Sequence, residues 1–166
     1  MAIESRGKYF YDEIITALSG LSSTYDITAV FNIDNPFISS KPVISVYVGD
    51  DLTEESIVNE GKHRVSIRNV DFQIYVAYKI QDSSDELALK KQRWIISEKI
   101  REHLAPYISM GKKWATQEYT SGAYTCKILI REMTLDDFYF AEVLSEDNNS
   151  NYEIMQVRGN IKYREN

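Results

Sequence analysis

The sequence has only one cysteine, Cys126, among 166 residues. An internal disulfide or a cysteine-based zinc site needs more than one cysteine, so both are excluded. Cys126 lies within an apolar strand pattern and is interpreted as a buried, inert thiol. The two histidines, His63 and His103, have no second ligand at metal-binding spacing, so structural roles are favoured for both. The seven glycines are scattered, which excludes a glycine-rich phosphate-binding loop.

Long apolar segments are also missing. No run reaches the length of about 18 residues that indicates a membrane-spanning helix. The first residues lack the apolar segment of a secretory signal, so no signal peptide is expected. The low cysteine content is typical of proteins in a reducing compartment.

The composition is that of an ordinary globular protein, with 43% hydrophobic and 27% charged residues. The length predicts a single domain over residues 1–166. There are 25 acidic and 19 basic residues, which give a net charge of −6. This charge argues against nonspecific binding of nucleic acid by the surface as a whole, because such binding depends on cations that neutralise phosphates.

Two amphipathic helices are predicted, over residues 8–22 and 83–104. Ser83 and Glu86 have the spacing of a capping box at the start of the second helix, and Pro106 predicts its end. The residues expected on the buried faces are Phe10, Ile14, Leu18 and Leu21 in the first helix, and Leu89, Ile96, Ile100 and Leu104 in the second, with Ala88, Trp94 and Ile95 widening the second stripe.

Strands are predicted where apolar residues alternate. The clearest signal covers residues 64–80, where every second residue from position 70 onward is apolar. Val65 and Ile67 have the opposite parity, so we expect a bulge or bend near Asn69 and a projection of residues 64–68 beyond the sheet toward another subunit. Further strands are predicted over residues 26–33, 42–49, 123–133, 137–144 and 154–163, the last with an interruption at Gly159.

The order of these elements is helix, strands, helix, strands. It predicts an α+β fold, in which two principal helices pack on one face of a mainly antiparallel sheet. Residues 35–42 and 107–122 are interpreted as irregular segments, and residues 50–62 as a solvated acidic loop or a short helix after Thr53.

The acidic loop contains carboxylates that could form a metal site. Asp50, Asp51 and Glu54 could bind a divalent cation, but they lack the ligand spacing and the turn glycine of a calcium loop. A nuclease-type site usually adds a nearby Glu-x-Lys. Glu60-Gly61-Lys62 follows Asp50 by ten residues and none follows Asp71 closely, so a nuclease is kept only as an alternative. We therefore predict no catalytic residues, no metal ligands and no cofactor.

The second helix is rich in basic residues. A solvated face with local ion pairs explains them, and a contact with an acidic neighbour is the functional alternative. In that alternative, copies of the chain associate side by side, with the acidic loop of one copy beside the basic helix of the next. Twelve tyrosines also favour an interface, and Tyr9, Tyr11, Tyr139 and Tyr163 are expected to be partly exposed. The predicted interface residues are Lys90, Lys91, Arg93, Asp50, Asp51, Glu54, Glu55 and Tyr163.

The arrangement resembles a known family. The resemblance rests on five elements: the first helix, the strand Pro-Val-Ile-Ser-Val-Tyr-Val at 42–48, the long strand at 69–80, the capped helix at 83–104 and the final strand at 154–164. This order is similar to that of the tail-terminator (tail-completion) proteins of tailed bacteriophages. Neck and head–tail connector proteins are similar in size and in their general arrangement. Segments 107–122 and 134–151 have no counterpart in the resemblance.

The resemblance implies a structural virion protein without enzymatic activity. Such a protein forms a ring, usually a homohexamer, that caps the tail tube and joins it to the neck. Its partners would be other copies of itself and the tail tube, sheath or neck proteins, while DNA passes through the lumen without specific binding. It would be assembled in the host cytoplasm and located in the virion. The alternatives are a small metal-dependent nuclease and a non-viral cytosolic binding module.

Overall fold

The computed structural model describes residues 6–24, 43–58, 64–80, 83–108, 117–121, 124–144 and 151–165. These residues form two helices and five strands. In chain order, they are α1 (Arg6–Thr24), β1 (Val43–Val58), β2 (Arg64–Ile80), α2 (Ser83–Ile108), β3 (Gln117–Ser121), β4 (Tyr124–Leu144) and β5 (Asn151–Glu165).

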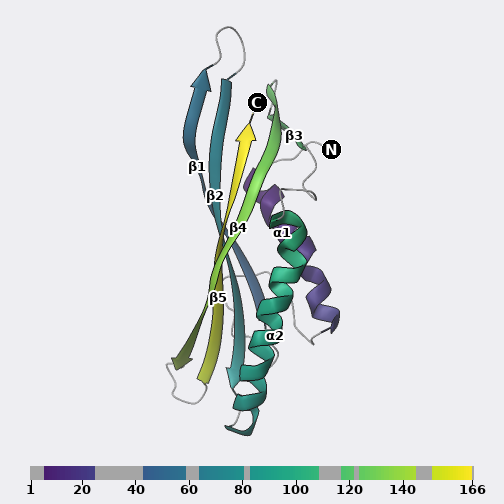
Figure 1. Cartoon of the computed structure of the whole chain (residues 1–166), viewed down its shortest axis with the longest axis vertical. Coiled ribbons are helices and arrows are strands. Elements are labelled where there is room, and N and C mark those ends of the chain that lie inside the picture. The colour runs from purple at the N-terminus through teal and green to yellow at the C-terminus, as the bar shows by residue number, and fades with distance from the viewer. Residues whose placement is uncertain are drawn as a thin grey trace.

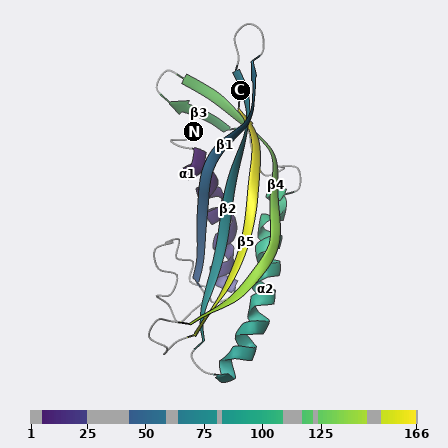
Figure 2. The same ribbon diagram turned by 90° about the vertical axis from the view of Figure 1, so that its left-hand side faces the viewer.

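All five strands belong to one antiparallel sheet with the order β1-β2-β5-β4-β3. The last strand, β5, lies at the centre, between β2 and β4. Both helices pack on the same face, with α1 over β1 and α2 over β2 and β4, and they lie behind the sheet in Figure 2. The molecule is elongated along the strands (Figure 1). The predicted α+β fold, with two helices on one face of an antiparallel sheet, is confirmed.

The core lies between the helices and this face of the sheet. The buried face of α1 contains the four predicted residues, because spacings of three and four place them on one side of a helix, and it also contains Tyr9. On β2 the even-numbered residues from Val70 to Val76 are buried, and on β5 the odd-numbered ones from Met155 to Tyr163. Burying each large apolar side chain contributes about 1.5–3 kcal/mol.

Helix α2 confirms part of its predicted stripe. Ile96, Ile100 and Leu104 are fully buried, whereas the side chain of Leu89 lies outside the described residues. Trp94 and Ile95 are 56% and 45% exposed, so the prediction that they widen the stripe is wrong. They are neighbours of Ile96 in the sequence, but the turn of the helix places their side chains on a side that does not contact the sheet.

The predicted end of α2 at Pro106 is also wrong, because the helix continues to Ile108. Proline is least tolerated in a helix interior, where it removes a hydrogen bond and clashes with the preceding turn. Pro106 lies in the last turn and is exposed, and Tyr107 beside it is buried in the core. Packing of Tyr107 therefore helps to hold this turn in place.

Strand β1 is much longer than predicted. It continues through the acidic residues to Val58, where a loop or a short helix was expected. The reason is non-local: residues 51–58 pair with residues 64–70 of β2. Two register shifts, between Val48 and Asp51 and between Thr53 and Glu55, absorb the extra residues.

The same register corrects the prediction for β2. Its pairing with β5 runs from Ser66 to Ile80 without a shift, so there is no bulge near Asn69 on that side, and the extra residues belong to β1. Ser66–Arg68 pairs with strands on both sides, so this segment lies within the sheet and does not project beyond it as predicted.

Strand β4 combines two predicted strands into one. It runs from Tyr124 to Leu144 with register shifts between Ile130 and Glu132 and between Leu135 and Phe138. The segment interpreted as irregular contains strand β3, which pairs with the first residues of β4. The predicted strand at 26–33 and the loop at 35–42 lie outside the described residues.

Strand β5 is not interrupted at Gly159, which pairs with Phe72 on one side and Leu135 on the other. Glycine is required at this position because there is no space for a side chain. A Cβ atom at this position would lie 2.6 Å from Cε1 of Phe72 and 2.7 Å from the backbone oxygen of Thr134. The absent side chain leaves room for the Phe72 ring above β5 on the helix face of the sheet.

Candidate subunit interface

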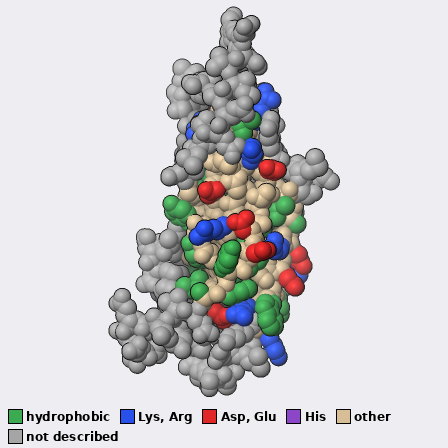
Figure 3. All heavy atoms as spheres, turned by 60° about the vertical axis from the view of Figure 1, so that its left-hand side comes forward, with side chains coloured by type: hydrophobic (Ala, Val, Ile, Leu, Met, Phe, Trp, Pro, Cys, Tyr) green, Lys and Arg blue, Asp and Glu red, His purple; other side chains and the backbone are tan. Residues whose placement is uncertain are grey.

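The face of the sheet opposite the helices carries a polar network. The Tyr75 hydroxyl donates to Oε1 of Gln73, and Nε2 of Gln156 donates to the same oxygen at 3.1 Å. Further along, Nδ2 of Asn160 donates to Oδ1 of Asp71 at 2.7 Å. Figure 3 shows acidic and basic side chains interspersed with hydrophobic ones over the described part of this side of the molecule. Such a mixed polar surface can contact another protein but has no single charge that favours nucleic acid.

Exposed tyrosines lie at both sides of this face. Tyr47 of β1 is 44% exposed and Tyr139 of β4 is 63% exposed. Each lies between neighbours whose side chains point to the helix face, so both tyrosines point away from the helices. Tyrosine provides a large contact area at low entropic cost, which makes these two positions candidate contact residues.

The other tyrosine predictions have mixed outcomes. Tyr139 is exposed and Tyr11 is half-buried, as expected, but Tyr9 and Tyr163 are buried. Tyr163 is 0% exposed, and its ring centroid lies 5.1 Å from that of Phe10 of α1. The expected exposure of Tyr163 is therefore wrong, because central placement of β5 turns its odd-numbered side chains into the core.

The long strands β1 and β4 lie at the two sides of the described sheet, although residues 43–46 of β1 are buried. Among the described strands, β1 pairs only with β2, and β4 beyond Ile128 pairs only with β5. Successive pairs β1–β2, β2–β5 and β5–β4 are all antiparallel, so β1 and β4 run in opposite directions. An unpaired edge presents backbone donors and acceptors that can bind another strand.

A regular block crosses the four long strands without a register shift. It joins the first residues of β1 to the last third of β4, which lie at the same level of the sheet. Its four rows are Val43–Ala77–Ile154–Ala141, Ile44–Val76–Met155–Phe140, Ser45–Tyr75–Gln156–Tyr139 and Val46–Ile74–Val157–Phe138.

An aromatic corner lies where α2 meets this part of β4. We define it as Arg93, Trp94 and Phe140. The Arg93 guanidinium carbon lies 4.5 Å from the ring centroid of Phe140 and 5.7 Å from that of Trp94. Arg93 also forms an ion pair with Glu153, which is 1% exposed. Trp94 and Phe140 are 56% and 38% exposed, so the corner presents aromatic surface beside the unpaired edge of β4.

Sequence reasoning missed Glu153 and Phe140. A signal for Glu153 was present, because it has the same parity on β5 as Met155 and Val157, which are buried. A carboxylate at such a position needs a buried partner, and Arg93 is that partner. The exposure of Phe140 had no comparable signal, since it depends on β4 being an outer strand over this length.

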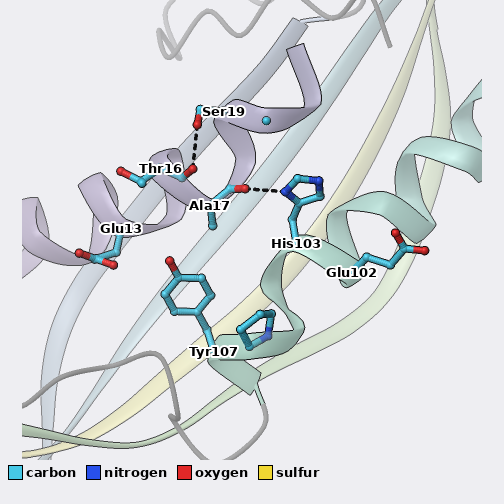
Figure 4. A pocket seen from close by; sticks show the side chains of 9 residues that line it. Glu13, Thr16, Ala17, Ser19, Glu102, His103 and Tyr107 are labelled. Carbon is cyan, nitrogen blue, oxygen red and sulfur yellow. Dashed lines mark hydrogen bonds between the residues drawn. The ribbon is translucent and has the colours of Figure 1, made fainter. Parts of the chain in front are cut away.

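A groove with a volume of ≈ 610 Å³ separates the two helices on their outer side (Figure 4). Nδ1 of His103 lies 2.8 Å from the carbonyl oxygen of Ala17, which can only accept, so Nδ1 carries the proton. Gly20 leaves room for this imidazole, since a Cβ atom there would lie 2.9 Å from Cε1 of His103. Burial, the charge of Glu13 and a hydrogen bond to Glu13 raise the pKa of Tyr107. These contacts join α1 to α2, which is a structural role for His103.

The predicted interface residues are distributed over distant parts of the chain. Lys91 is exposed and Arg93 is half-buried on α2, while the side chains of the others except Tyr163 lie outside the described residues: Lys90, Asp50, Asp51, Glu54 and Glu55. The acidic part of β1 pairs with the start of β2, whereas α2 begins just after the end of β2. The two charged segments are therefore at opposite ends of the molecule (Figure 1). Their pairing between copies stays a prediction, and it requires copies displaced along the strand direction.

No protein-family model and no curated protein matches this chain. Within the described part of the chain, neither helix has the length and hydropathy needed to cross a membrane. The same residues contain no group of three or more side chains placed to hold a metal ion. The functional argument therefore depends on the face of the sheet opposite the helices and on the outer strands β1 and β4.

Proposed function

We propose that the chain is a structural virion protein that assembles into a ring, caps the tail tube of a bacteriophage and joins it to the neck. The order of elements supports this function through its resemblance to tail-terminator proteins. The geometry supports the ring, and it does so independently of the resemblance.

One observation supports assembly into a ring. Among the described strands, β1 and β4 beyond Ile128 are the outer strands of the sheet, and they run in opposite directions. When one copy is rotated about an axis roughly parallel to the strands, its β1 comes beside β4 of the first copy in an antiparallel arrangement. Such a contact joins two different surfaces, so repeating it produces a closed ring when the rotation divides a full turn.

The charge of the chain is compatible with a ring through which DNA passes. The net charge is −6, and the described part of the face opposite the helices mixes both signs. A surface without an excess of cations does not retain DNA by counterion release, so DNA could slide through the lumen.

The ring is tested by the mass of the purified chain in solution, measured by light scattering over a range of concentrations, together with negative-stain images. We expect one discrete oligomer, a hexamer on the family resemblance, with a central hole. A monomer at every concentration would overturn the ring.

The role at the tail is tested separately. Labelled protein mixed with purified tail tubes of the same phage should bind at one end only, and tubes already completed should not bind it. Binding along the whole tube or none at all would contradict the capping role. Incubation with plasmid DNA and Mg²⁺ tests the nuclease alternative, for which cleavage would be the positive result.

A further inference from the structure

The groove between α1 and α2 is built from one side of each helix. On α1, Glu13, Ala17 and Gly20 are spaced by four and three residues, which places them on one side of the helix. On α2, His103 and Tyr107 are four residues apart and also share a side. Tyr107 is hydrogen-bonded to Glu13, and His103 is bonded to Ala17. These two contacts are one turn apart, about 6 Å along the helices.

The hydroxyl groups of α1 that line the groove have their hydrogens engaged within the helix. The Thr16 hydroxyl donates to the carbonyl oxygen of Asp12 at 2.7 Å. The Ser19 hydroxyl donates to the carbonyl oxygen of Thr16 at 2.8 Å. Neither hydroxyl therefore has a hydrogen to offer to a bound molecule, because a hydroxyl carries only one.

The contacts between the helices engage the other hydrogens. The Tyr107 hydroxyl donates to the Glu13 carboxylate, and Nδ1 of His103 donates to the carbonyl oxygen of Ala17. What remains is acceptor capacity. A carboxylate can accept about four hydrogen bonds, and the neutral imidazole has a lone pair on Nε2. Within the described part of the chain, Nε2 of His103 has no hydrogen-bond partner.

The charge of the groove has one sign. None of the nine described residues that line it is lysine or arginine, whereas Glu13 and Glu102 are acidic (Figure 4). Lys99 forms an ion pair with Glu102 and offsets its charge. Glu13 has no ion pair with another described residue, so it carries the uncompensated negative charge of the groove.

Gly20 keeps the free edge of the imidazole accessible. It is exposed, and a Cβ atom at this position would lie 2.9 Å from Cε1 and 4.0 Å from Nε2 of His103. Any side chain here would therefore crowd the ring or cover Nε2. Glycine leaves the lone pair of Nε2 open to a donor in the groove.

We propose that this groove is a binding site for a guanidinium group. A groove that offers only acceptors and has a net negative charge fits a cation with several N–H donors. Guanidinium has five such donors in a planar fork, so one edge can contact Glu13 while another contacts Nε2 of His103. The groove volume of ≈ 610 Å³ also leaves room for the chain that carries the group. This inference goes beyond the proposed function and does not depend on the ring.

The test is a titration of the full chain, labelled with ¹³C at its alanine methyl groups, with Nα-acetyl-arginine amide. The methyl signal of Ala17, which lines the groove, should shift and saturate at millimolar concentrations, since a single ion pair at a partly exposed site is weak. The signal of Ala141, exposed on β4, should not shift. Nα-acetyl-citrulline amide has nearly the same shape without the charge and should shift neither signal. An Ala17 shift that is absent, or equal with citrulline, would overturn the site.

Two matched variants separate this site from general attraction between opposite charges. Glu13→Gln keeps an acceptor for Tyr107 but removes the charge, and should weaken binding about tenfold or more with an unchanged circular dichroism spectrum. Glu102→Gln removes the same charge from a carboxylate that Lys99 already offsets, and should change the affinity less than about twofold. Equal effects of the two variants would contradict the site.

The native mass identifies the source of the guanidinium group. If Nα-acetyl-arginine amide at saturation lowers the mass and citrulline amide does not, an arginine of a second copy normally occupies the groove. If the mass is unchanged while Ala17 shifts, the group belongs to a different molecule. Both results support the site, because both require binding in the groove.

Discussion

Replacing Gly159 with alanine should destabilise the subunit by about 2 kcal/mol. The new Cβ would lie 2.6 Å from Cε1 of Phe72 and 2.7 Å from the backbone oxygen of Thr134, far inside van der Waals contact. Phe72 is 0% exposed and cannot swing into solvent without leaving the core. The Thr134 oxygen belongs to the neighbouring strand and can move only if that strand moves.

The magnitude follows from two opposing effects. Overpacking a dense core costs about 1–3 kcal/mol, and the upper end applies because a ring and a backbone atom both obstruct the methyl group. Alanine restricts the unfolded chain more than glycine does, which returns about 0.5–1 kcal/mol. The backbone conformation of Gly159 is not in the left-handed region, so no further strain is expected there.

The measurement is urea unfolding followed by circular dichroism at one fixed protein concentration. Gly49→Ala is the matched control, because the nearest obstacle to its Cβ is the backbone oxygen of Asp71 at 3.3 Å. That contact needs a shift of only a few tenths of an ångström, so the control should lose less stability. In a double-mutant cycle, Phe72→Leu should recover part of the loss of Gly159→Ala, since leucine lacks the obstructing ring atoms.

Two results would refute this reasoning. One is a stability of Gly159→Ala within about 0.5 kcal/mol of the original chain, which is the range of ordinary surface substitutions. The other is strict additivity of Gly159→Ala and Phe72→Leu, because residues that collide must show a coupling energy.

The remaining predictions concern the second helix. Ile100→Ala should cost about 2–5 kcal/mol in urea unfolding by leaving a cavity against the sheet, and a loss below 1 kcal/mol would contradict its burial. Arg93→Leu should cost about 3–5 kcal/mol because it leaves the Glu153 carboxylate buried without its cation, whereas Arg93→Leu/Glu153→Leu should recover most of the loss; equal losses in both variants would exclude this explanation. The pKa of Tyr107 is raised above its ordinary value of 10.0 by burial and by Glu13, so the folded state holds this proton where the unfolded state has released it. Stability should therefore fall as the pH rises above about 10, and Tyr107→Phe should reduce that slope; an unchanged slope would count against the effect.

Several features of the fold could be predicted from local periodicity alone. Spacings of three and four in residues 8–22 predicted the buried face of α1, and the alternation after residue 70 predicted the core face of β2. These patterns are informative because a helix turns every 3.6 residues and a strand alternates every two, whatever the rest of the chain does. The fold class followed from the order of the elements.

The boundaries of elements were harder to predict. The sequence of residues 50–58 is polar and acidic, which is typical of a loop, yet pairing with β2 extends β1 through it. Pro106 is a helix breaker, yet packing of Tyr107 keeps the last turn helical. In each case a contact with a distant residue outweighs the local preference.

The candidate interface depended almost entirely on the tertiary structure. The sequence identified tyrosines as contact residues, but it could not distinguish Tyr139, which is exposed on an outer strand, from Tyr163, which is buried on a central one. Both lie in alternating strand patterns. Their difference comes from the insertion of β5 between β2 and β4, a pairing of strands that are far apart in the chain.

Local periodicity thus identified both helices, most of the strands and the apolar sides of α1 and of β2 from Val70 onward, but not β3 or the second half of β1. Tertiary packing sets the order of the strands, the burial of Glu153 against Arg93 and the outer positions of β1 and β4. The physical reason is that side-chain periodicity is a local property of the backbone, whereas strand order and exposure are set by how well distant surfaces pack together.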